Sequence, residues 1–188
     1  MASAFTLEET ARRLGSYRWV ELRLYEAMGG WVDSIAELDV RLAVGRACSP
    51  HAWHASVWLD RLPAGRDPDA LTQPAHDAVA GLLQGVASAE GTLERLVGAY
   101  RVVLPRLVAA YTAHLNHTSA AADGPTARGL GMVLADEVAA WREGELLVQS
   151  LIASAADARR AAEHQARLEA MAADAGGLAG PGTLRPRP

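Results

Sequence analysis

Lysine is absent from this chain, and several other residue types are nearly absent. All 18 basic residues are arginine, Phe5 is the only phenylalanine, and Asn116 is the only asparagine. These residue types have AT-rich codons, whereas alanine, arginine, glycine, leucine and valine abound. The arginines therefore reflect a GC-rich bacterial genome, and they do not indicate a surface selected to bind phosphate.

The chain also lacks the features of a disulfide framework, of secretion and of membrane insertion. Cys48 is the only cysteine, so no intramolecular disulfide can form, and its small apolar neighbours favour a packed, inert thiol. No basic start followed by an apolar stretch opens the chain, and charged residues interrupt every long apolar run. Acids and bases are mixed along the chain, with a net charge of −4, which does not indicate nucleic-acid binding. We expect a cytoplasmic protein with no nucleic-acid and no membrane partner.

What the sequence does contain is a helical pattern of apolar residues. At 188 residues and 50% hydrophobic content, the chain can form one good core. Thr6 and Glu9 make a capping box, after which apolar residues recur at steps of three and four. The pattern predicts helices over residues 7–28, 34–61, 75–87, 92–115, 125–153 and 156–173, and no strand. Pro50 lies inside the second helix and should kink or split it.

The connections between the long helices favour one arrangement. The first two helices are joined tightly, as are the helices over 92–115 and 125–153, whereas about thirty residues separate the two pairs. A long crossover between two tight pairs is typical of ferritin-like bundles, although connection lengths leave other arrangements open. We predict an all-α, ferritin-like four-helix bundle with a long crossover between helices 2 and 3 and an extra, surface-lying C-terminal helix. Residues 1–175 are expected to form a single domain, and residues 176–188 a disordered tail.

Three of the expected helices carry polar side chains on or near their buried faces. Glu21 lies in an apolar stripe of the first helix, and Glu137 lies in one of the helix over 125–153, with Asp136 at its edge. His51 and His54 are three residues apart and project from one face of the second helix. A buried carboxylate needs a partner, a proton or a metal ion, and imidazoles and carboxylates are common transition-metal ligands.

Two interpretations of these residues stay open. In the first, Glu21, His51, His54 and Glu137 hold a single or atypical iron or manganese centre, with Asp136 outside the ligands. In the second, the same residues form a metal-free, buried ionic network in a ligand-binding or protein-interaction module. An arginine would then be the simplest partner for Glu21, and Arg18, Arg46 and Arg142 are the candidates.

Three short runs carry a resemblance to a known family. Tyr17-Arg-Trp-Val-Glu21, His51-Ala-Trp-His54 and Leu134-Ala-Asp-Glu137 resemble an uncharacterised bacterial branch of the ferritin-like superfamily. Metal-bearing members of that superfamily take a Glu from each of two helices and a Glu-x-x-His from each of the other two. Glu21 matches the first carboxylate, His54 the first histidine, and Asp136 or Glu137 the second-motif carboxylate. His51 replaces a Glu, and Ala139 or Ala140 stands where a His is expected. The resemblance implies an oxidoreductase with an atypical metal site.

The position of the first turn decides whether the expected ligands meet. Glu21 and His51 are level only if that turn is centred near Ser34. A reversal at Gly30 would separate them by more than ~10 Å, at ~1.5 Å per residue along the helix. The metal interpretation depends on that turn. The amphipathic last helix is compatible with a homodimer, and the sequence leaves an unidentified small-molecule partner open.

Overall fold

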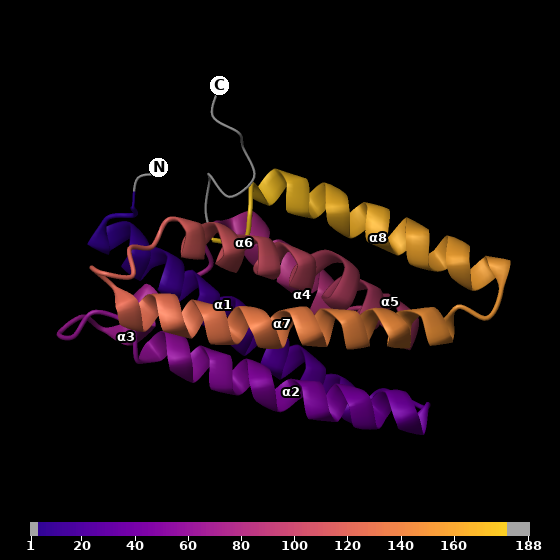
Figure 1. The fold of residues 1–188 in the computed structure, drawn as a ribbon. Coiled ribbons are helices and arrows are strands. Elements are labelled where there is room, and N and C mark those ends of the chain that lie inside the picture. The colour runs from indigo at the N-terminus through magenta and orange to yellow at the C-terminus, as the bar shows by residue number, and fades with distance from the viewer. Residues whose placement is uncertain (1–3, 180–188) are drawn as a thin grey trace.

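A computed structural model describes residues 4–179, and this part of the chain is helical almost throughout, with no strand (Figure 1). The all-α prediction is confirmed. In chain order the elements are α1 (Leu7–Trp31), the 3₁₀ turn η1 (Val32–Ser34), α2 (Leu38–Leu59), α3 (Pro68–Leu71), α4 (Asp77–Ala87), α5 (Thr92–Leu96), the π-helical segment η2 (Val97–Val103), α6 (Leu104–Asn116), α7 (Gly124–Leu151) and α8 (Ala155–Ala175).

Helix α1 begins as predicted but ends later. The Thr6 hydroxyl accepts a 3.2 Å hydrogen bond from the Glu9 amide, as a capping residue does. The helix then runs through Gly29-Gly30 to Trp31, so the predicted end near Met28 is wrong. Trp31 is buried, and its indole N–H donates to the Ala87 carbonyl of α4 at 3.2 Å. This distant contact extends the helix past the two glycines.

The second helix starts later than predicted and is not split. Asp33 and Ser34 lie in η1, and α2 follows Glu37, which makes no side-chain cap. Pro50 lies within α2, yet the helix continues to Leu59. The side of α2 that carries Pro50 is exposed, so water can reach the carbonyl that this proline leaves without a partner. Helices α1 and α2 form the most extensive helix pair of the fold.

The third long helix changes its winding partway along. Residues 92–116 form one continuous rod, in which the π-helical segment η2 separates α5 from α6. Pro105 lies in the first turn of α6, directly after η2. A proline lacks the N–H of a regular helix, so its position at the end of a wider turn fits the break in the ordinary hydrogen-bond pattern. The sequence predicted one helix over residues 92–115 and did not indicate the π-helical turn within it.

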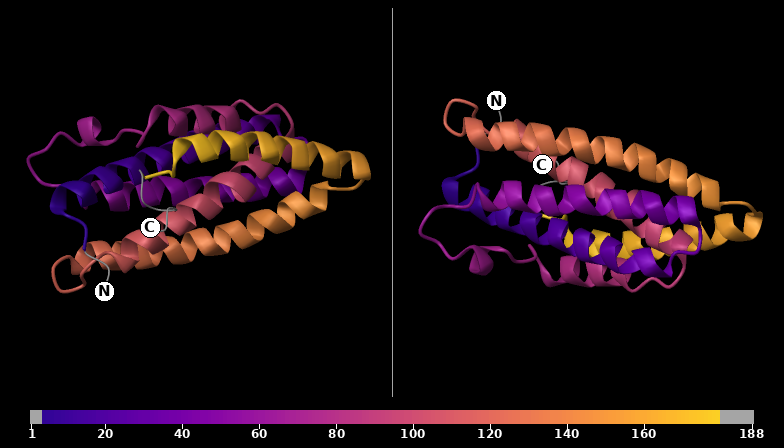
Figure 2. Two further views of the ribbon diagram at one scale, coloured as in Figure 1. Left: turned by 90° about the horizontal axis from the view of Figure 1, so that it is seen from above. Right: turned by 90° about the horizontal axis from the view of Figure 1, so that it is seen from below.

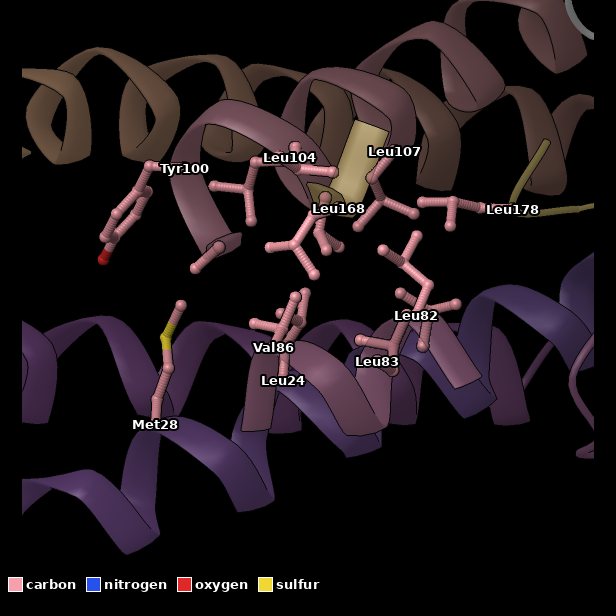
Figure 3. Close-up of a cluster of buried hydrophobic side chains, with 14 of the residues drawn as sticks. Leu24, Met28, Leu82, Leu83, Val86, Tyr100, Leu104, Leu107, Leu168 and Leu178 are labelled. Atoms are coloured by element: carbon pink, nitrogen blue, oxygen red, sulfur yellow. The ribbon is translucent and has the colours of Figure 1, made fainter. Parts of the chain in front are cut away.

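The crossover between α2 and α5 contributes to the core. Its helix α4 packs against α1 and α8, and Figure 2 shows α8 lying along this side of the bundle. In Figure 3, Leu24 and Met28 of α1 and Leu82 and Val86 of α4 face Leu168 and the α6 leucines. Helix α8 was expected at the surface, but one of its faces is buried at the following residues: Ala161, His164, Leu168, Ala172 and Ala175.

The segment after α8 is partly ordered by packing. Gly176 ends the helix in the left-handed conformation, with φ of 64°, which glycine adopts without strain. Leu178 and Ala179 are buried, and the Ala179 carbonyl accepts a hydrogen bond from Arg12. The predicted disordered tail is therefore wrong for residues 176–179, and its remainder, 180–188, lies outside the described residues. Within residues 4–179, no helix is both long and apolar enough to cross a membrane.

Candidate metal centre

Four buried side chains from three helices meet inside the bundle. Glu21 comes from α1, His51 and His54 from α2, and Glu137 from α7. None of the four is more than 2% exposed. One ligand atom from each residue can be chosen so that all four lie within 4.8 Å of one another. The structure thus brings together the four residues that the sequence placed on three different helices, and this group could hold a metal ion.

The turn between α1 and α2 sets this register. Because α1 continues to Trp31, the chain reverses over η1 and Ile35, close to Ser34. This is the position at which Glu21 and His51 become level. The Nδ1 atom of His51 lies 2.6 Å from Oε2 of Glu21. A reversal at the glycine pair would have separated these two side chains by about three helical turns.

Each imidazole lies between the two carboxylates. Besides its contact with Glu21, Nδ1 of His51 is 3.3 Å from Oε1 of Glu137. Nδ1 of His54 is 3.0 Å from the same Glu137 oxygen and 3.4 Å from Oε1 of Glu21. The two histidines and two glutamates therefore form one compact, alternating group of opposite charges.

No arginine serves as the partner of Glu21 in the described chain, so that expectation is wrong. Arg18 instead reaches Thr72 and Asp69, at the crossover. The hydroxyl of Tyr111, from α6, donates a 2.5 Å hydrogen bond to Oε1 of Glu21. The indole N–H of Trp58 donates in turn to the Tyr111 oxygen at 3.2 Å. The third long helix thus contributes a tyrosine that holds a carboxylate in place. The sequence predicted the helix over residues 92–115 but did not indicate this contact.

Asp136 lies at the edge of the site, as predicted. Its side chain is 54% exposed, and its Oδ2 lies 3.4 Å from Nε2 of His54. Since Nδ1 of His54 faces the two glutamates, Asp136 contacts the opposite ring nitrogen. A carboxylate at that second nitrogen orients an imidazole whose other nitrogen is a ligand.

The cluster strongly favours charged histidines when it holds no metal. Burial alone would lower the pKa of His51, but hydrogen bonds and the charges of Glu137 and Glu21 outweigh it and raise the pKa to about 9. The same balance raises the pKa of His54 to about 10. Burial opposes ionisation of Glu21, yet contacts with both histidines lower its pKa to about 2. Two imidazolium charges then balance the two carboxylates.

One atom of the cluster has no partner. Oε2 of Glu137 is buried and accepts no hydrogen bond within the described chain. A buried carboxylate oxygen without a partner is unfavourable by roughly 1–3 kcal/mol or more. A bound cation would provide that partner. Two imidazoles and two carboxylates are also a donor set that first-row transition metals accept, so the residues fit such an ion.

A groove between α2 and α7 reaches the cluster from one side; the two helices run along the face seen from below in Figure 2. Its volume is about 410 Å³, and His51, His54 and Glu137 are among the residues that line it. Glu21 is not among its lining residues. Tyr100, from η2, is another wall of this α2–α7 groove. A Cβ atom on Gly144 would lie 2.0 Å from the Tyr100 ring, so only glycine allows the ring to pack there.

His114 does not join this group. It is buried near the end of α6, and neither ring nitrogen makes a hydrogen bond within the described residues. Burial, assisted by the charge of Arg13, lowers its pKa to about 4, so the ring is neutral near pH 7.

No protein-family model matches the sequence, and no curated protein or solved structure is significantly similar to it. The resemblance to the ferritin-like superfamily stays a prediction. The chemistry of the site itself is therefore the only guide to what the protein does.

Proposed function

We propose that this protein is a ferritin-like helical-bundle oxidoreductase that binds one iron or manganese ion through Glu21, His51, His54 and Glu137. The observation that carries the proposal is the convergence of four buried ligand atoms within 4.8 Å. Buried carboxylates are rare unless they are paired, and a buried cluster that holds two of them needs a compensating arrangement.

The geometry favours one ion over two. Metal–nitrogen and metal–oxygen bonds of roughly 2.0–2.2 Å place two ligand atoms of one ion at most about 4.4 Å apart. The four atoms lie within 4.8 Å of one another, so shifts of a few tenths of an ångström would bring them to about that range. Two-metal carboxylate sites in helical bundles use four carboxylates and two histidines. This cluster has two histidines but only two carboxylates.

Charge balance makes the exchange of protons for a metal ion favourable. The metal-free cluster holds two imidazolium and two carboxylate charges, which sum to zero. A divalent cation with two neutral imidazoles and two carboxylates also sums to zero. Binding therefore releases two protons and leaves no uncompensated charge in the core, which avoids the large cost of burying a net charge.

Nitrogen and oxygen ligands of this type are those of non-haem iron and of manganese. When bound, such an ion supplies one-electron chemistry with oxygen or peroxide. The residues of the chain supply the surroundings: Tyr111 and Trp58 hold Glu21, Asp136 orients His54, and the α2–α7 groove leaves one side of the cluster accessible. A site that is closed on one side and accessible on the other suits a reaction centre better than a purely structural ion.

The arrangement of helices supports the ferritin-like part of the proposal. Helix α1 pairs with α2, α6 pairs with α7, and the segment over residues 60–91 connects the two pairs. Ligands on the first, second and last of these helices follow the ferritin-like pattern. The departures are His51 in place of a glutamate and Tyr111, which contacts Glu21, on the helix where a carboxylate is expected.

A second function is favoured by the pairing within the cluster. Hydrogen bonds between its own side chains already satisfy Glu21, His51 and His54 without a metal ion. The same residues would then be a buried ionic network that fixes the helix register of a ligand-binding or interaction module.

Metal analysis separates the two functions. Untagged protein is loaded anaerobically with ferrous iron or manganese, desalted and analysed for metal beside a His51→Gln, His54→Gln variant. A His76→Gln, His117→Gln variant is the matched control, because it removes two histidines outside the cluster. The proposal predicts about one ion per chain in the wild type and control and none in the cluster variant. Equal metal content in all three proteins would contradict it, and no metal in any would favour the ionic network.

A further inference from the structure

We propose that the α2–α7 groove binds a small monocarboxylate with an apolar body, held by Arg46, with the far end of the molecule against the metal cluster. The inference rests on the proposed metal site for its chemistry, whereas binding itself depends only on the groove. It specifies the class of molecule that the proposed oxidoreductase would act on.

The groove is the accessible side of the cluster. Three of the four cluster residues line it, namely His51, His54 and Glu137, so a molecule in the groove touches the groups that would hold the ion. Its volume of about 410 Å³ is near the lower end of the roughly 300–1,000 Å³ found for small-molecule sites. The groove therefore suits a small molecule.

Small apolar side chains create this space. Ala43 and Ala47 form one wall on α2, and Ala139 and Ala140 form the other wall on α7. The Tyr100 ring is also part of the lining, and Gly144 allows it to pack there. These walls offer few hydrogen-bonding groups along the middle of the groove. The body of the molecule should accordingly be apolar, aromatic or branched.

Arg46 provides a cation with no partner of its own. It is exposed and is the only arginine among the described lining residues, and it makes no ion pair or hydrogen bond in the described chain. A guanidinium binds a carboxylate through two parallel hydrogen bonds, which gives orientation as well as affinity. Arg46 precedes His51 by five residues, about 7.5 Å along α2 at ~1.5 Å per residue. A carboxylate at Arg46 thus leaves a body of that length to reach the cluster.

The acids of the groove restrict the ligand further. Glu143 lies on the α7 wall, and Asp136 lies beside His54 at the cluster end. Both would repel a second negative charge, and Asp136 disfavours a carboxylate at the cluster end. Asp136 therefore directs the carboxylate away from the cluster and toward Arg46, whereas Glu143 weakens the binding of any negative charge and so disfavours a second carboxylate.

The test uses 3-phenylpropanoate as the probe and 3-phenylpropan-1-ol as its uncharged match, each titrated into the full chain by calorimetry or ligand-detected NMR. We expect the carboxylate to bind about fivefold more tightly than the alcohol, which is typical of an ion pair at an exposed arginine. Arg46→Gln should remove this preference without changing alcohol binding. Glu143→Gln should strengthen carboxylate binding by a similar or smaller factor.

The position of the probe is tested separately. Ala140→Leu fills the groove and should weaken both probes, whereas Ala135→Leu, the same change at an exposed α7 position outside the groove lining, should not. In manganese-loaded protein, relaxation of the aromatic protons should be enhanced more than that of the protons beside the carboxylate. Circular dichroism of each variant confirms that the helices are intact.

The outcomes distinguish this inference from the proposed function. Equal affinity for the carboxylate and the alcohol, or no loss with Arg46→Gln, overturns the monocarboxylate class. Unchanged probe binding in Ala140→Leu, or no probe binding to the wild type, contradicts the α2–α7 groove as the binding site. Metal-stripped wild-type protein is titrated in parallel. If the protein binds the probe but never takes up metal, only the proposed metal-binding function is contradicted. If it takes up metal but does not bind the probe, only the proposed monocarboxylate site is contradicted.

Discussion

The hydroxyl of Tyr111 on α6 lies 2.5 Å from Oε1 of Glu21 on α1, and it donates its proton to that carboxylate. Burial and the negative charges of Glu21 and Glu137 raise the pKa of Tyr111 well above its ordinary value, so the hydroxyl stays protonated and remains a donor. The contact connects the third long helix to a cluster whose members all come from other helices. Tyr111 therefore helps to hold one oxygen of Glu21 in place, while His51 contacts the other.

Replacing Tyr111 with phenylalanine tests this relationship. Tyr111→Phe removes the donor to Glu21 and leaves the Trp58 indole N–H without its acceptor. We expect a loss of about 1–3 kcal/mol in the free energy of unfolding and of about tenfold in metal affinity. Chemical denaturation and a competition titration with a metal-binding dye measure the two effects. Tyr25→Phe, at an exposed position, is the control and should change neither; unaltered metal affinity in Tyr111→Phe would show that Glu21 is held by other contacts.

Metal binding should release protons. Near pH 7 both cluster histidines carry a proton in the metal-free protein, since their pKa values are about 9 and about 10. A metal ion that takes both imidazoles as ligands must displace both protons. Calorimetric titrations in buffers of different ionisation enthalpy should give about two protons per ion. A value near zero would mean that the ion binds elsewhere.

The stability of the metal-free protein should fall as the pH rises. The pKa values of His51 and His54 in the folded chain lie above the ordinary value of 6.5, so their stabilisation is complete below pH 6.5 and is lost as the pH rises through about 9 to about 10. Glu21 acts in the opposite sense. Its pKa is lowered to about 2, so its contribution is present above the ordinary pKa of 4.5 and is lost in acid.

Thermal unfolding of chelator-treated protein measures this dependence. The Tm of the wild type should decrease across pH 6.5 to about 10, and the His51→Gln, His54→Gln variant should show a flatter profile. Metal-loaded protein should also be flatter, because its imidazoles are already neutral. A wild-type profile parallel to that of the double variant would indicate that the two histidines are uncharged in the folded protein.

Gly144 should tolerate no side chain. The Cβ of Gly144→Ala would meet the Tyr100 ring at 2.0 Å, which requires the ring or α7 to move. We expect a destabilisation of about 1–3 kcal/mol and an altered groove. Gly131 lies on the same helix, and a Cβ atom added there would have no other atom within 4 Å. Gly131→Ala should therefore stabilise the folded protein by up to about 1 kcal/mol, as expected for this change in a helix. Equal effects of the two substitutions on denaturation would contradict the packing argument.

The sequence predicted those parts of the fold and site that depend on local periodicity. The three- and four-residue steps placed Glu21 and Glu137 on buried faces, and the spacing of His51 and His54 put both on one face of a helix. The capping signal at Thr6 was also local, and it was confirmed. These features require only the geometry of a single helix.

The remaining features depend on contacts between distant segments. Helix α1 passes Gly30 because Trp31 packs on α4, and no local pattern indicates that contact. The π-helical turn that carries Tyr100 has no established sequence signal. Leu178 and Ala179 follow a glycine pair and resemble a tail in composition, yet they are buried against the bundle. Composition describes the chain alone, whereas these residues are ordered by the surface that they cover.

The distribution of the cluster along the chain has a consequence for its assembly. Glu21, His51 and His54 belong to the tightly paired α1 and α2, whereas Glu137 is more than eighty residues further on. Since a chain emerges from the ribosome N-terminus first, the first helix pair can expose three of the four proposed metal ligands to its surroundings before α7 has been made. Docking of α7 then adds the fourth ligand and covers the other three. The identity of the trapped ion would therefore be decided during synthesis, by which metal the hairpin meets first.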